Sequence, residues 1–449
     1  MRIIKKAKEI SIFLNILRRR ASGGGSSIER AVNSILSDVK KNGDAAVLRY
    51  TRKFDYADAK HLLFKRTEIS KFADKADRKI VRALEISAKR IRRFHEMQKE
   101  ESWVVRDSEY RKLPANKNTN PAFSHALLGQ MIRPIERVGV YVPGGKASYP
   151  STVLMNVIPA QAAGVKEIAV CVPTPRGEIN PYVMAAIEML GIKEAYRIGG
   201  AQAVGAMAYG TQTIKRVDKI VGPGNIYVAA AKRMVFGEVD IDMIAGPSEI
   251  LIIADASANP AFIAADLLSQ AEHDELASSV LITDSKILAE DVSREIERQM
   301  AKLKRRTIAS KSIKNYGAVI IVRDIAHAVK LSNDIAPEHL EIMTEKPAAV
   351  LPEIKNAGAI FLGRWTPEPL GDYSAGPNHT LPTGGTARFF SPLGVYDFIK
   401  RSSLLSFTRE GFMKIAETVK AIADIEGLEA HGNTIRIRTA ANAHKSRKK

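Results

Sequence analysis

The sequence contains a single cysteine, Cys171, among its 449 residues. One thiol excludes an internal disulfide and a thiolate zinc cluster, so any metal site must use nitrogen and oxygen ligands. So little cysteine is typical of the reducing cytoplasm, which is the compartment we expect. No apolar run approaches the roughly 18 residues that a membrane helix needs, so we expect no membrane-spanning helix. Residues 10–17 are too short for an export signal and have no cleavage site after them, so we expect none.

The formal net charge of +19 is concentrated at the two ends of the chain. Residues 1–20 contain seven Lys and Arg with one Glu, and residues 431–449 contain six Lys and Arg with no acid. The body is only mildly basic and has no basic stripe interleaved with aromatics, so we expect no nucleic-acid partner. The helix-like spacing of residues 1–20 fits packing on the body or on a second subunit, or else a membrane surface. Residues 22–27 are typical of a flexible linker.

From residue 138 onward, short β-rich runs alternate with alanine-rich helical runs. The expected strands are 138–142, 167–172, 195–198, 219–221, 249–254, 279–283, 319–322 and 359–363. The expected helices between them are 151–163, 181–190, 201–209, 225–236, 260–272 and 286–304. Strands separated by helices of this length predict βαβ units, so the chain is expected to form two α/β parallel sheets in tandem.

The motif G-x-G-x-x-G of dinucleotide-binding folds is absent. Four glycine-rich turns are present instead, at residues 143–145, 199–200, 222–225 and 246–248. We place them at the carboxyl ends of the strands, where ligands bind in open parallel sheets. Their backbone N–H groups suit a phosphate or another anion. Tight turns without any ligand remain the alternative.

Four short segments carry the side chains of an active site. Gln270 and His273 are three residues apart on one helix face, a spacing that offers two ligands to one metal, although a histidine capping a helix end is the alternative. Glu338 and His339 follow Pro337, which indicates a helix start. A neutral imidazole beside a carboxylate is suited to proton transfer, and an ordinary helix cap is the alternative.

The other two segments pair a carboxylate with an imidazole. Residues 371–380 form a loop of turn-forming residues that includes Asp372 and His379, and loops of this kind often carry function. Glu426 and His431 form a similar pair just before the basic tail. The donors Gln, His, Asp and His would suit zinc, with manganese or cobalt as alternatives.

These residues lie in long ordered motifs, and with them the chain closely resembles the histidinol dehydrogenase family from about residue 28 to 438. The densest matches are 138–145 (VGVYVPGG), 198–203 (IGGAQA), 221–225 (VGPGN), 245–249 (AGPSE), 269–273 (SQAEH), 336–340 (APEHL), 371–373 (GDY) and 426–428 (EGL). The resemblance implies a zinc enzyme that oxidises L-histidinol to L-histidine with two NAD through a bound aldehyde. It also implies an intertwined homodimer whose active sites lie between subunits.

By motif position, the resemblance implies a role for each residue. Zinc ligands are Gln270, His273, Asp372 and, from a second subunit, His431; the catalytic pair is Glu338 and His339. The substrate-binding residues are Ser248, Gln270, His273, His339, Asp372, His379, Glu426 and His431. NAD contacts are Tyr141, Gln202 and Asn225. Because Cys171 lies on an expected buried strand without a motif beside it, we do not expect a thiol-bound aldehyde.

The expected fold is therefore α/β, with two tandem incomplete Rossmann-like parallel-sheet domains and small helical N- and C-terminal extensions. Residues 1–21 form the N-terminal extension, and residues 22–140 with 250–393 form the domain carrying most catalytic and metal residues. Residues 141–249 form the NAD-binding domain, and residues 394–449 a helical dimerisation segment with a basic tail. The loop around residues 113–121 is expected to be a surface excursion.

Two alternatives remain open. A sister alcohol dehydrogenase would use the same zinc and NAD for another substrate, such as a sulfonated diol. His379 and Glu426 discriminate, because a carboxylate suits a substrate imidazole and repels a sulfonate. A nucleic-acid-binding protein would use the basic ends and would leave the catalytic motifs unexplained.

Overall fold

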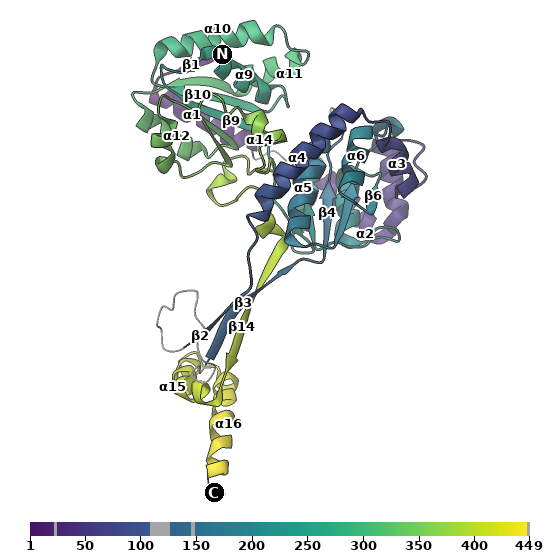
Figure 1. Cartoon of the computed structure of the whole chain (residues 1–449), viewed down its shortest axis with the longest axis vertical. Coiled ribbons are helices and arrows are strands. Elements are labelled where there is room, and N and C mark those ends of the chain that lie inside the picture. Colours follow the sequence, from purple (N-terminus) through teal and green to yellow (C-terminus); the bar gives the residue numbers. More distant parts are fainter. Residues whose placement is uncertain (22–24, 108–125, 145–148, 447–449) are drawn as a thin grey trace. The chain divides into compact units, whose positions relative to one another are not determined.

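The computed structural model describes residues 1–21, 25–107, 126–144 and 149–446 (Figure 1). These residues form two compact units, which are described separately. The first comprises Met1–Lys99 and Pro134–Phe398, and the second Glu100–Arg133 and Ile399–Lys449. The expected excursion at 113–121 and residues 22–24 of the expected linker lie outside the described residues.

The first unit contains a six-stranded sheet in the order β1-β11-β10-β9-β12-β13, with every neighbouring pair parallel. Its strands are β1 (Arg2–Ile4), β9 (Glu249–Ala254), β10 (Ser278–Thr283), β11 (Gly317–Ile321), β12 (His339–Met343) and β13 (Ala359–Leu362). Successive side chains of β9 point to opposite faces, and all six of its residues are buried. Both faces of the sheet are therefore covered, as parallel sheets require.

Helices on the two faces of this sheet belong to two apolar clusters. Ile250 and Ile252 pack with α9 (Pro260–Ala271), α10 (Lys286–Met300) and α11 (Arg306–Tyr316). Leu251 and Ile253 pack with α1 (Ala7–Ala21) and α12 (Ile325–Ile335). The short α13 (Pro347–Val350) and α14 (Glu368–Tyr373) flank β13 in the chain, and the 3-10 turns are Pro175–Gly177, Leu351–Glu353, Thr386–Arg388 and Val395–Phe398.

A second sheet in the same unit has five parallel strands in the order β6-β5-β4-β7-β8. They are β4 (Arg137–Tyr141), β5 (Glu167–Cys171), β6 (Glu194–Tyr196), β7 (Lys219–Val221) and β8 (Asp240–Ile241). One apolar cluster covers it with α2 (Ser26–Phe54), α7 (Gly200–Tyr209) and α8 (Ile226–Val235). Another uses α3 (Arg66–Ala73), α4 (Arg78–Glu96), α5 (Pro150–Ala163) and α6 (Pro181–Met189).

Helices α2, α3 and α4 lie within residues 22–140, which were expected to form one domain with residues 250–393. Their packing partners belong to the five-stranded sheet. Amphipathic spacing marks a buried face but does not identify the sheet that covers it.

The second unit is built from β2 (Trp103–Asp107), β3 (Ala126–Pro134), β14 (Ile399–Phe407), α15 (Arg409–Ile425) and α16 (Glu429–Ser446). The three strands form a sheet in the order β14-β3-β2, and β2 and β3 are antiparallel. Among the described residues, no helix has the length and apolar composition to cross a membrane.

The α/β fold with two parallel sheets is confirmed, and α1 packs on the body through Ile10, Phe13 and Leu17. Two local predictions are wrong. Residues 2–4 form strand β1 rather than the start of a helix. Pro337 does not begin a helix, because α12 ends at the left-handed Ala336 (φ 53°) and β12 starts at His339.

The predicted helix start at Pro337 is wrong because the segment that follows it is buried in the sheet. Proline fits the first turn of a helix but equally fits the residues that lead into a strand. Here the five residues of β12 are all buried between β9 and β13, so pairing with two strands decides the conformation.

Candidate active site

The predicted residues His339 and Ser248 lie at the amino edge of the six-stranded sheet, because His339 begins β12 and Ser248 immediately precedes β9. The turn 246–248 was expected at a carboxyl edge, and that expectation is wrong. A crossover helix runs antiparallel to its strands, so the end of α9 returns to the amino edge with Gln270 and His273. The amide of Ser278 at the start of β10 donates to Ser248 O at 3.0 Å, which joins two of these strand starts.

His339 is buried, and its two ring nitrogens have different surroundings. Nδ1 lies 3.0 Å from the carbonyl oxygen of Glu249 and 3.0 Å from Nε2 of Gln270. Nε2 has no hydrogen-bond partner among the described residues and lies 3.6 Å from Asp372 Oδ1. A proton on Nδ1 donated to Glu249 O leaves the Nε2 lone pair as a base facing Asp372.

Glu338 lies beside this imidazole. Its Oε2 accepts the backbone N–H of Glu249 at 2.8 Å and lies 3.6 Å from His339 Nδ1. Burial raises the pKa of Glu338 to about 7. Burial opposes a charge on His339, but the carboxylates of Glu338, Asp372 and Glu368 outweigh it and raise the pKa of His339 to about 10. A carboxyl whose pKa lies near neutral pH therefore stands beside an imidazole whose pKa is raised by its carboxylate neighbours.

Three potential metal ligands converge next to His339. One ligand atom from each of His273, Glu368 and Asp372 lies within 4.8 Å of the others. His273 follows the C-cap of α9, whereas Glu368 and Asp372 lie on α14, four residues apart on one helix face. Burial raises the pKa of Glu368 to about 8, and although burial acts the same way on Asp372, His339 holds the pKa of that carboxyl well below its usual range.

The donor set fits a divalent cation. Imidazole nitrogen and carboxylate oxygen are the ligands that zinc takes when no thiolate is present. Burial, with a smaller contribution from neighbouring carboxylates, raises the pKa of Glu338 and Glu368, and a cation beside them would stabilise their ionised forms. Gln270 is buried, and its amide lies against the His339 ring, so its side chain is part of the same cluster.

Glu368 was not predicted from the sequence, and neither was Glu341, the residue that holds it in place. Glu341, a buried residue of β12, accepts the backbone N–H of Glu368 through Oε1 at 2.8 Å and so ties α14 to the strand of His339. Two signals were available: Glu368 and Asp372 at helical spacing, and a lone carboxylate inside the apolar run 339–343.

The remaining predicted substrate residues divide between the two units. His379 Nδ1 lies 3.0 Å from the carbonyl oxygen of Asp372, and burial lowers the pKa of His379. Ser248 adjoins Glu249 at the strand start. Glu426 caps α15, His431 lies on α16, and both are exposed members of the second unit.

The expected NAD residues lie at the carboxyl edge of the five-stranded sheet. Tyr141 ends β4, Gln202 lies in the first turn of α7, and Asn225 caps α8 by accepting the amides of Tyr227 and Val228. The amide of Gly200 donates to the hydroxyl oxygen of Tyr141 at 3.0 Å.

Close backbone contacts hold the turns of this edge together. A Cβ on Gly222 would lie 2.1 Å from the carbonyl oxygen of Tyr141, and the φ of +110° at Gly222 also requires glycine. Cβ atoms on Gly144 and Gly199 would lie 2.4 and 2.5 Å from Pro173 side-chain atoms. The glycines therefore bring the turns after β4, β5, β6 and β7 together at one edge.

Known proteins match nearly the whole chain. The histidinol dehydrogenase family model matches residues 18–439. Histidinol dehydrogenases from Geobacter sulfurreducens and Bacillus subtilis are 54% and 50% identical over 422 and 423 residues, covering 93% and 94% of this chain and 95% and 96% of the relatives. A crystal structure of histidinol dehydrogenase from Elizabethkingia anophelis superimposes with a TM-score of 0.90 at 36% identity, covering 99% of both chains. The chain therefore belongs to the histidinol dehydrogenase family and is an oxidoreductase.

Proposed function

We propose that this chain oxidises L-histidinol to L-histidine, the last step of histidine biosynthesis, in two steps that use two NAD and pass through bound L-histidinaldehyde. Membership of the family supports the substrate. The observation that carries the chemistry is the buried His339. Its Nε2 has no hydrogen-bond partner in the described part of the chain and lies 3.6 Å from Asp372, beside a cluster of potential metal ligands.

The metal of this proposal is zinc, one per subunit. Gln270, His273 and Asp372 would hold it from one chain, together with His431 of the partner subunit. Glu368 offers a further oxygen, since its carboxylate belongs to the cluster with His273 and Asp372. Zinc, when bound, supplies a template for the imidazole and amino nitrogens of the substrate.

Proton transfer falls to the catalytic pair. Nε2 of His339 takes the hydroxyl proton as the alcohol is oxidised, while Nδ1 stays oriented by the Glu249 carbonyl at 3.0 Å. Glu338 takes a proton from the water that adds to the aldehyde carbon. After it has released its first proton to solvent, His339 accepts the proton released when the hydrate is oxidised to the acid. A positioned base of this kind contributes about 10² to 10⁴ in rate.

The substrate contacts of this proposal surround the same pair. They are Ser248, Gln270, His273, His339, Asp372 and His379, with Glu426 and His431 of the partner subunit. A carboxylate such as Glu426 suits the cationic or neutral imidazole of histidinol and would repel a sulfonate, which favours histidinol over a sulfonated diol.

NAD would bind along the carboxyl edge of the five-stranded sheet and supplies the hydride acceptor for both oxidations. Tyr141, Gln202 and Asn225 are the contacts we propose. The glycine turns that meet at this edge let the backbone approach closely next to the starts of α7 and α8, and helix N-termini suit a pyrophosphate.

A homodimer with shared active sites completes the proposal. The second unit exposes large apolar side chains, with 65% of Leu405, 85% of Ile425 and 69% of Ile437 accessible. Surfaces of this kind usually bind a partner, and a second copy of this chain would also bring its Glu426 and His431. We place the enzyme in the cytoplasm, without a membrane or nucleic-acid partner.

One experiment tests the proposal. The purified protein is stripped of metal with a chelator, zinc is restored, and the NADH formed per L-histidinol consumed is counted. We expect two NADH and a strict dependence on zinc. One NADH per substrate, or turnover only with another alcohol, would contradict the proposed reaction.

A further inference from the structure

Arg20, in the last turn of α1, makes a set of buried contacts. Its side chain is only 1% exposed and forms an ion pair with Glu249 through Nη2. Nη1 donates to the carbonyl oxygen of Leu276 at 2.6 Å and lies 3.4 Å from that of Ser248. The guanidinium also lies over the Tyr316 ring, 5.6 Å from its centroid. A planar guanidinium with several donors suits such multiple contacts better than an ammonium.

Glu249 connects this guanidinium to the catalytic pair. Its backbone N–H donates to Glu338 Oε2 at 2.8 Å, and its carbonyl oxygen lies 3.0 Å from His339 Nδ1. Both contacts follow from the register of β9 and β12, in which His339 pairs with Ile250. The backbone of one residue thus orients both catalytic side chains, while its side chain is held by Arg20.

The hydrogen bond from Arg20 to the Leu276 carbonyl also holds the segment that carries His273 of the candidate metal cluster. Leu276 lies in the segment between α9 and β10, which includes His273. Within this segment, Asp274 Oδ1 accepts the N–H of Leu276 at 3.0 Å, and Arg305 donates to the His273 carbonyl at 3.3 Å. Arg20 therefore joins the start of β9 to the segment of His273.

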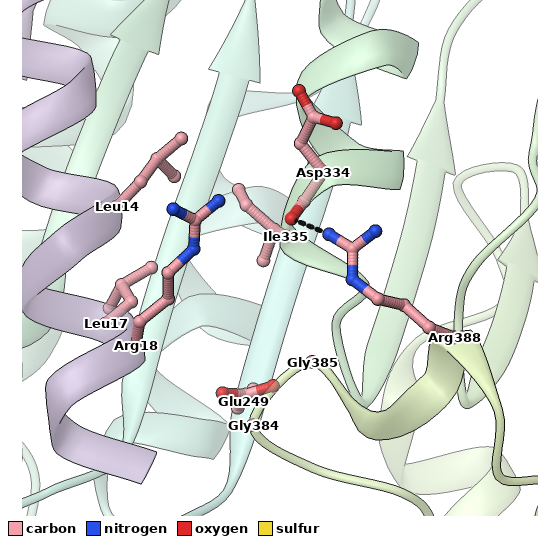
Figure 2. A pocket seen from close by; sticks show the side chains of 9 residues that line it. All are labelled: Leu14, Leu17, Arg18, Glu249, Asp334, Ile335, Gly384, Gly385 and Arg388. Atoms are coloured by element: carbon pink, nitrogen blue, oxygen red, sulfur yellow. Dashed lines mark hydrogen bonds between the residues drawn. The ribbon is translucent and has the colours of Figure 1, made fainter. Parts of the chain in front are cut away.

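The helix that carries Arg20 is seated directly beside Glu249. A pocket of about 120 Å³ lies beside α1. Figure 2 shows Leu14, Leu17 and Arg18 of α1 on one wall of it and Glu249 at its base. Leu17 is buried in the apolar cluster that covers the six-stranded sheet, and Arg20 follows it by one turn. The docking of α1 thus determines where the guanidinium lies.

We propose that Arg20 is a positioning residue of the active site, acting through Glu249, Ser248 and Leu276 on Glu338, His339 and His273. This inference rests on the proposed function. Burial raises the pKa of Glu249 against the opposing effect of Arg20, so the carboxylate depends on its guanidinium partner. Without Arg20, Glu249 would take a proton or move toward water, and the backbone contacts of the catalytic pair would move with it.

The test compares Arg20→Met, Arg20→Lys, Glu249→Gln and the double variant Arg20→Met/Glu249→Gln. Arg19→Met is the matched control, because it removes the same charge from an exposed position in the same helical turn. For each protein we measure kcat, the KM for L-histidinol and NAD, the bound metal and the melting temperature. Loss of a residue that orients others typically lowers activity by about 10- to 100-fold.

We expect Arg20→Met to lower kcat by about 10- to 100-fold while the KM for NAD stays unchanged, and Arg20→Lys to restore part of the loss. The double variant removes the buried charge and should recover the melting temperature but not kcat, because the contacts with Ser248 and Leu276 remain absent. Full kcat in the folded double variant would show that Arg20 only neutralises Glu249 and would overturn the proposal. Absence of histidinol oxidation by the wild-type protein would instead contradict the proposed function.

Discussion

Asp372 Oδ1 lies 3.6 Å from Nε2 of His339, the nitrogen that has no hydrogen-bond partner among the described residues. The two residues come from different elements, α14 and β12, and Glu341 joins these elements by accepting the amide of Glu368. The relationship places a carboxylate of the candidate metal cluster beside the proposed catalytic base. We therefore expect a substitution of either residue to change both the metal affinity and the rate of proton transfer.

Replacing the base should remove most of the catalysis. We expect His339→Asn to lower kcat by about 10² to 10⁴, because the change removes the imidazole that takes the alcohol proton. Glu338→Gln should slow the oxidation of histidinaldehyde more than that of histidinol, since Glu338 acts on the added water. Steady-state rates with both substrates check this, with the exposed His61→Asn as control. Equal slowing of the two steps would contradict the role of Glu338.

Glu368 should matter for the metal. We expect Asp372→Asn to lose its zinc during dialysis and Glu368→Gln to bind zinc about 10- to 100-fold more weakly, because both carboxylates belong to the cluster with His273. Metal analysis and titration with a competing chelator measure the affinity. Glu353→Gln, an exposed position, is the control. Unchanged affinity in Glu368→Gln would exclude Glu368 as a ligand.

His95 should contribute to the pH dependence of stability. Its Nδ1 lies 2.8 Å from Gln98 Oε1, and burial lowers the pKa of His95 below its usual value. Below pH of about 6.5 the unfolded chain binds a proton there and the folded chain does not, so the free energy of unfolding falls as the pH drops.

The measurement is a series of melting temperatures between pH 8 and pH 5. We expect His95→Gln to lose less stability on acidification than the wild type, while His61→Gln, at an exposed position, follows the wild type. The partly buried His273 and His379 also have pKa values lowered by desolvation and will keep part of the acid sensitivity. Identical slopes for His95→Gln and wild type would contradict the assignment.

Cys171 should take no part in the reaction. It ends β5 in the apolar cluster that covers the five-stranded sheet, and burial raises the pKa of its thiol. We expect no alkylation by iodoacetamide until the protein unfolds, because the thiolate is the reactive form. Cys171→Ala should keep its kcat and lose about 1 to 2 kcal/mol of stability through the small cavity. Loss of kcat in a folded Cys171→Ala protein would instead support a mechanism in which the thiol takes part.

Shared active sites predict complementation between inactive chains. Asp372→Asn and His431→Asn should each be inactive alone. When they are mixed and allowed to exchange subunits, half of the dimers become heterodimers with one intact site, so activity should return to about one quarter of wild type. Size-exclusion chromatography confirms that the mixture is dimeric. No recovery in dimers shown to have exchanged would contradict the contribution of His431 from a second chain.

The sequence alone predicted much of the fold and most of the candidate site. Alternating strand and helix patterns predicted strands such as β9, whose expected range 249–254 is the observed one, and helices such as α5, expected at 151–163 and observed at Pro150–Ala163. These signals are local: period, turn residues and caps depend on neighbours in the chain. Gln270, His273, Glu338, His339 and Asp372 were likewise identified from short motifs, and the structure brings these five together.

Only the tertiary structure decided which strand starts and helix ends meet. In the structure, β12 follows Pro337 where a helix was predicted, and the turn 246–248 lies at the amino edge of its sheet. The structure also places Glu249, Glu341 and Glu368 at the site. It also made α1 a neighbour of the active site through Arg20. Strand pairing and buried charge contacts join residues far apart in the chain, so no local pattern contains them, whereas propensity and motif chemistry are properties of the sequence itself.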